Sequence, residues 1–98
     1  GYFYMHVVSA LRELKHEYPE IICYEVMTSE SQPVEFCIGI YPEAVKKAEL
    51  RCKEEIQIRW MLSKCDIAVV YMNGVKNYYE NVIKEAQTVG KEIIDIVL

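Results

Sequence analysis

Four residues after the apolar run Ile67–Met72 have the types and spacing of a ligand-binding turn: Asn73, Gly74, Asn77 and Tyr78. Open α/β sheets bind ligands beyond the carboxyl ends of their strands, where free backbone N–H groups of the next helix favour an anion. The alternative is a turn with no ligand, in which Asn77 only caps the following helix. We therefore treat these four residues as candidate ligand contacts.

Three more candidates lie upstream in the chain. Arg59 could bind a phosphate or a carboxylate with two parallel hydrogen bonds, and an ion pair with Asp66 or Glu55 is the alternative. Thr28 and Ser29 begin a polar loop just past a predicted strand end, which makes this loop a candidate ligand rim. The expected ligand-binding residues thus come from three separate segments.

Metal or catalytic chemistry has no such signal. The four cysteines are spread almost evenly along the chain: Cys23, Cys37, Cys52 and Cys65. They form no C-x-x-C pair and have no histidine at ligand spacing, so we expect reduced, buried thiols without a metal. No residue stands out as catalytic and no cofactor is indicated, so the sequence does not decide whether the protein is an enzyme.

Length and charge limit the classes of function. Ninety-eight residues predict one domain, and no apolar run reaches the roughly 20 residues that cross a bilayer. A net charge of -4 argues against a general nucleic-acid binder, which needs a basic surface. No secretion signal is visible, so we expect a cytoplasmic protein with neither a membrane nor a nucleic acid as partner.

Hydrophobic spacing predicts alternating helices and strands. The expected helices cover 3–18, 44–64 and 79–89, and the expected strands cover 21–27, 35–41, 67–72 and 92–97. Gly90 is expected to end the last helix in a left-handed conformation. Alternation of this kind predicts an α/β domain with a mostly parallel sheet of about four strands and helices on both faces. The unbroken run Ile67–Met72 predicts a central strand that is buried on both faces.

The segments IRWMLSKCD, IAVVYMNG and AQTVGKEIIDI (residues 58–66, 67–74 and 86–96) resemble the SLOG superfamily. This resemblance implies a three-layer Rossmann-like fold over residues 1–98 and relatives among small bacterial and phage proteins. The chain departs from the family pattern because a helix starts directly at its beginning, without the usual first strand, which suggests a fragment. Tyr78 also stands where the family has a glycine, so it would obstruct a phosphate.

The resemblance implies a small-ligand binding module for a nucleotide or a nucleotide-like metabolite. A second hypothesis is a degenerate, non-catalytic domain that serves oligomerisation or partner binding. A third is an N-glycosidic or phosphoribosyl hydrolase. Because a missing first strand would leave a strand edge unpaired, we also expect a homodimer or a higher homo-oligomer.

Overall fold

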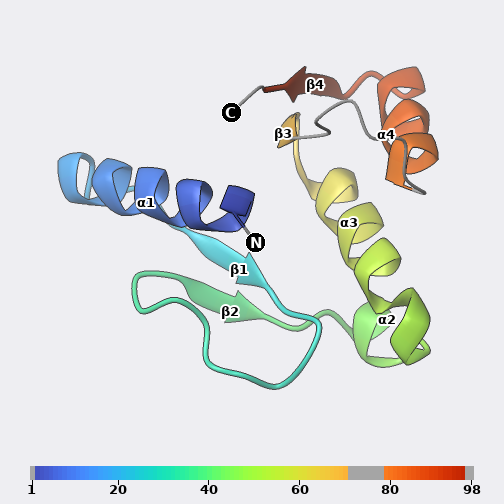
Figure 1. Ribbon diagram of the computed structural model, residues 1–98, viewed down its shortest axis with the longest axis horizontal. Coiled ribbons are helices and arrows are strands. Elements are labelled where there is room, and N and C mark those ends of the chain that lie inside the picture. The colour runs from blue at the N-terminus through green and yellow to red at the C-terminus, as the bar shows by residue number, and fades with distance from the viewer. Residues whose placement is uncertain (1, 71–78, 97–98) are drawn as a thin grey trace.

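The computed structural model describes residues 2–70 and 79–96 of the chain (Figure 1). Its helices are α1 Tyr2–Glu17, α2 Glu43–Lys46, α3 Lys53–Lys64 and α4 Tyr79–Thr88, with a short 3-10 helix at Leu50–Cys52. Its strands are β1 Tyr24–Val26, β2 Ile38–Ile40, β3 Ile67–Val70 and β4 Glu92–Asp95. The predicted mixture of helix and strand is confirmed.

The described strands form two parallel pairs rather than one sheet. β1 pairs with β2, β3 pairs with β4, and helix α3 connects the two pairs (Figure 1). Within the described residues β4 is the only strand that pairs with β3. The side chains of Ile67 and Val69 are each 54% exposed. The prediction of a central strand buried on both faces is therefore wrong. An apolar run shows that residues avoid water, but it does not specify which elements will cover them.

The core lies on one face of the β3–β4 pair. Its members come from α3, α4 and the strands: Leu62, Val82 and Ala86, with Ile58, Cys65, Ala68 and Ile93 packed against them. Successive side chains of a strand point to opposite faces, so Ala68 faces this core while its neighbours Ile67 and Val69 face away from it. Helices α3 and α4 thus cover one face of this pair and leave the other partly open.

The helix expected over 44–64 is broken, because α2 ends at Lys46 and α3 begins at Lys53. The Lys53 ammonium stabilises this break. It donates hydrogen bonds to the carbonyls of Val45 at 2.9 Å and Lys46 at 3.2 Å, and so satisfies groups that a continuing helix would have paired. Val45 is fully buried, which fixes the short helix α2 in place.

Helix α4 ends as the sequence predicts. Gly90 has φ of 90°, and the N–H groups of Gly90 and Lys91 donate to the carbonyls of Gln87 and Ala86 at 3.1 Å each. This pair of hydrogen bonds is a Schellman motif, which requires a left-handed residue after the helix. The chain then turns directly into β4.

Candidate functional site

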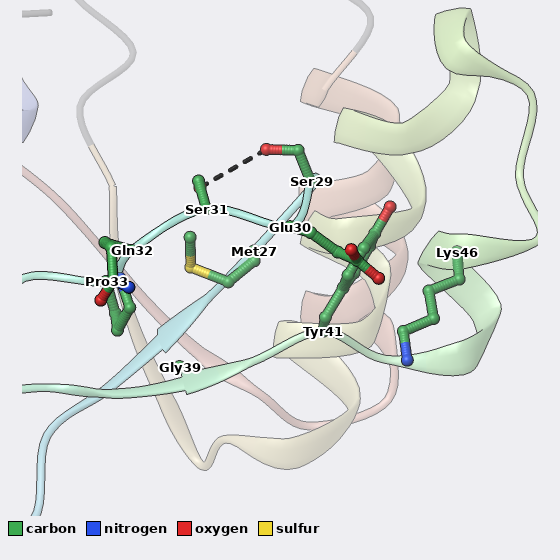
Figure 2. Close-up of a pocket in the computed structure, with 9 residues that line it drawn as sticks. All are labelled: Met27, Ser29, Glu30, Ser31, Gln32, Pro33, Gly39, Tyr41 and Lys46. Atoms are coloured by element: carbon green, nitrogen blue, oxygen red, sulfur yellow. Dashed lines mark hydrogen bonds between the residues drawn. The ribbon is translucent and has the colours of Figure 1, made fainter.

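An open hollow of about 590 Å³ lies where β1 and β2 end (Figure 2). The two strands are parallel, so their carboxyl ends meet at the same edge of the pair. The hollow is lined by the loop after β1, by β2 itself and by the segment after β2: Met27, Ser29, Glu30, Ser31, Gln32, Pro33, Gly39, Tyr41 and Lys46. This edge is where open α/β sheets bind their ligands.

Tyr41 and Lys46 bring an aromatic ring and a cation to one side of the hollow (Figure 2). The Lys46 ammonium lies 5.3 Å from the centroid of the Tyr41 ring, within the range of a cation–π contact. On the same ring, Lys53 donates a hydrogen bond of 3.0 Å to the phenolic oxygen. The Glu43 carboxylate, 3.5 Å from Lys46, offsets part of this positive charge.

The Glu25 carboxylate holds the loop that forms the opposite side. Its Oε1 accepts a hydrogen bond of 2.8 Å from the backbone N–H of Val34, and its Oε2 accepts one of 3.3 Å from the Tyr4 hydroxyl of α1. Burial, followed by this carboxylate, raises the pKa of the Tyr4 hydroxyl. The hydroxyls of Ser29 and Ser31 lie 3.5 Å apart at the loop tip (Figure 2). One strand residue therefore links the loop to the first helix.

Gly39 packs closely against Pro33 at the hollow. A β-carbon at Gly39 would approach Cγ of Pro33 to 3.2 Å, which is tighter than ordinary van der Waals contact. A side chain at position 39 would therefore require Pro33 to shift by a few tenths of an ångström.

The structure brings only part of the expected site together. Ser29 lines the hollow, as the position of the loop predicted. Thr28 is half-buried beside the hollow but does not line it. Four further candidates fall outside the described residues: Asn73, Gly74, Asn77 and Tyr78.

Arg59 lies in a different place, at a groove between α3 and α4. Its guanidinium donates to Glu85 at 2.5 Å and to Glu55 at 3.4 Å. The hydrogen bond to Glu85 is the main cause of a raised pKa for Arg59. Of the two interpretations that the sequence offered, the ion pair with Glu55 is therefore present, and a second carboxylate joins it.

Tyr41 and Lys46 are the functional candidates that the sequence did not indicate. Tyr41 could have been found, because it ends a predicted strand immediately before Pro42 and so lies at the carboxyl edge. Lys46 had no such signal, since its place at the hollow depends on the short helix α2 ending where it does.

The described part of the chain contains no group of three His, Cys, Asp or Glu side chains that could hold a metal ion. All four cysteines are free thiols. Within residues 2–70 and 79–96, no helix has the length and apolar character needed to cross a membrane. The side chains that line the hollow offer a ligand hydroxyls, an amide, a carboxylate, an ammonium and one aromatic ring.

Comparison of the chain with protein-family models, with curated proteins and with solved structures finds no match.

Proposed function

We propose that this protein is a small-ligand binding module for a nucleotide-like metabolite, and that the hollow at the ends of β1 and β2 is its binding site. The observation that carries the proposal is the pairing of Tyr41 with Lys46 at this edge of the strands. The volume of about 590 Å³ lies within the range of roughly 300–1,000 Å³ that is usual for small-molecule sites.

Each polar group has a matching part in such a ligand. A planar base can pack on the ring of Tyr41, and a phosphate can accept hydrogen bonds from Lys46. The Ser29 and Ser31 hydroxyls and the Glu30 carboxylate can bind sugar hydroxyls, with the carboxylate as acceptor. These side chains all line the same hollow, so one ligand can reach them together.

The ion pair between Lys46 and Glu43 does not prevent this binding. Both side chains are well exposed, with 43% and 72% of their surface accessible. An exposed pair of this kind contributes little free energy, so a doubly charged phosphate can replace the Glu43 carboxylate as the partner of Lys46.

The three-layer Rossmann-like fold and the resemblance to the SLOG superfamily are part of this proposal. Two features support the fold. All described strand pairs are parallel, and α3 and α4 pack on one face of β3–β4 while α1 lies toward the other. Four free thiols agree with a cytoplasmic location, where disulfides do not usually persist.

Thermal unfolding with added ligands tests the proposal. Nucleoside monophosphates should raise the unfolding midpoint of the wild-type chain, because a ligand that binds only the folded state stabilises it by RT ln(1 + [L]/Kd). In Lys46→Met, the unfolding midpoint should rise no more with a nucleoside monophosphate than with the matching nucleoside. Lys47→Met is the matched control, because Lys47 is exposed next to Lys46 and does not line the hollow.

Two results would count against this function. One is the absence of stabilisation by any nucleotide or nucleoside at millimolar concentration. The other is a monophosphate effect of equal size in wild type and Lys46→Met, which would place the phosphate elsewhere.

Self-association is a second candidate function, and an apolar hollow of about 560 Å³ favours it. Val69 and Ile96 from the β3–β4 side form one wall, and α1 forms the other with Phe3, His6, Val7, Ala10 and Leu11. Val69 is 54% exposed and lines this hollow, so a second copy of the chain would cover apolar surface there.

Sedimentation velocity at micromolar concentration distinguishes a monomer from a homodimer. A homodimer is expected for the wild type, and Val69→Lys should convert it to a monomer by placing a charge in the apolar hollow. Leu50→Lys is the control, since Leu50 is already 86% exposed on another part of the surface. A wild-type monomer would rule out this second candidate.

A further inference from the structure

Cys23 and Cys37 face each other where β1 and β2 begin. The strand register pairs Tyr24 with Ile38, and the backbone N–H of Ile38 donates to the Cys23 carbonyl at 2.9 Å. Cys23 and Cys37 each precede their strand by one position. They are therefore neighbours across the pair, with side chains on the same face. The Cys23 thiol is close enough to help raise the pKa of Cys37, after burial of the Cys37 thiol itself.

The spacing of neighbouring strands suits a disulfide between Cys23 and Cys37. Neighbouring strands lie about 4.8 Å apart, and the Cα atoms of disulfide-bonded cysteines are usually about 4.4–6.8 Å apart. The other two cysteines provide a contrast, because Cys52 and Cys65 flank the twelve residues of α3. A helix rises 1.5 Å per residue, so these two cysteines lie about 20 Å apart and cannot be bridged.

The two thiols of the pair differ in access to solvent. Cys23 is buried, with 7% of its surface exposed, whereas Cys37 is half-buried. A reagent in solution therefore reaches Cys37 first, and Cys23 is held beside it as the second thiol. Thiol–disulfide exchange needs an accessible attacking thiol and a second thiol beside it that resolves the mixed disulfide, and the two cysteines have these positions.

We propose that Cys23 and Cys37 form a reversible disulfide site that reacts with low-molecular-weight disulfides such as oxidised glutathione. The Cys37 thiolate attacks one sulfur of the small disulfide, forming a mixed disulfide and releasing one thiolate. The Cys23 thiolate then attacks Sγ of Cys37, forming the internal disulfide and releasing the second thiolate. The two cysteines lose two protons and two electrons, and the small disulfide gains them to become two thiols.

The disulfide would act on the loop that lines the hollow. Residues 23 and 37 stand at the two ends of the segment that carries Ser29, Glu30, Ser31, Gln32 and Pro33. A covalent link between these ends limits how far the loop can open, whatever ligand the hollow takes. The chemistry of the site is thus independent of the proposed nucleotide binding.

Mass mapping of the native protein tests the proposal. Wild-type protein is incubated with oxidised glutathione, its remaining thiols are alkylated, and it is unfolded and cut after glutamate. Cleavage separates residues 21–25 from 36–43, so only a disulfide keeps these two peptides together. The paired variants are Cys52→Ser/Cys65→Ser, which retains the site, and Cys23→Ser/Cys37→Ser, which removes it.

The joined peptides should form in wild type and in Cys52→Ser/Cys65→Ser, and a reductant should separate them. Before unfolding, cleavage after Glu30 should be at least about threefold slower in the oxidised protein than in the reduced one, because the loop is closed. Persistent glutathione on Cys37 without the internal disulfide would overturn the exchange site. So would joined peptides that form only in urea, or a Cys52–Cys65 disulfide that forms equally fast. An unchanged cleavage rate would overturn the effect on the loop.

Discussion

Replacement of Gly90 by alanine tests how the turn between α4 and β4 is built. Gly90 has φ of 90°, a backbone conformation that residues with a side chain rarely adopt. A β-carbon added there would meet no atom within 4 Å. The cost of Gly90→Ala therefore comes from backbone strain alone, without a steric clash.

The size of the effect follows from two opposing contributions. An L-residue in the left-handed region costs about 1–2 kcal/mol, whereas replacing glycine by alanine restricts the unfolded chain and returns about 0.4–1 kcal/mol. We expect a net loss of about 1 kcal/mol in the free energy of unfolding. For a domain of this length, that loss lowers the unfolding midpoint by about 4–8 °C.

Circular dichroism during thermal and urea unfolding measures this loss. Gly90→Asn is the control, because asparagine tolerates the left-handed region better than alanine and should lose less stability. The reasoning is refuted if Gly90→Ala is as stable as the wild type. It is also refuted if the asparagine variant is destabilised more than the alanine variant, since strain would then not be the cause.

Three further predictions concern the core, the loop and the thiol. Leu62→Ala should lower the free energy of unfolding by about 2–4 kcal/mol in urea titrations. The control Leu50→Ala, on the exposed surface, should change it by less than about 0.5 kcal/mol. Similar losses in the two variants would contradict the assignment of Leu62 to the core. Glu25→Ala leaves the Val34 N–H without its acceptor and should cost about 1–3 kcal/mol, and an unchanged urea midpoint would show that the loop does not need this bond. Burial, and then the neighbouring Cys23 thiol, raise the pKa of Cys37, so its alkylation by iodoacetamide should need a higher pH than the alkylation of free cysteine. A pH midpoint of alkylation equal to or below that of free cysteine would contradict this.

Periodicity in the sequence predicted the order of helices and strands because each helix or strand must bury one face. The spacing of Val82 and Ala86 predicted the buried face of α4, and Gly90 predicted where this helix ends. Parallel pairing of β3 with β4 also followed from the helix between them, whereas β1 and β2 pair in parallel although only a loop connects them. These features depend on residues close to one another in the chain.

Features that depend on distant contacts were not predictable in this way. At the break between α2 and α3, the Lys53 ammonium folds back onto the carbonyls at the end of α2, a contact that no spacing rule reveals. The exposed face of β3 has the same origin, since the apolar run gave no sign of what would cover Val69. The loop of the candidate site was found because it follows a strand, but Lys46 reaches the hollow only through tertiary structure.

The most direct test of nucleotide-like binding is to map the ligand on the protein by NMR. Adenosine 5′-monophosphate is titrated into ¹⁵N-labelled protein while the backbone amide resonances are followed. Our proposal predicts that the largest shifts fall within residues 27–33 and 39–46, the two segments that contain the residues lining the hollow, and that they weaken in Lys46→Met. Shifts confined to the groove at Arg59 and Glu85, or no saturable shifts at millimolar ligand, would contradict it.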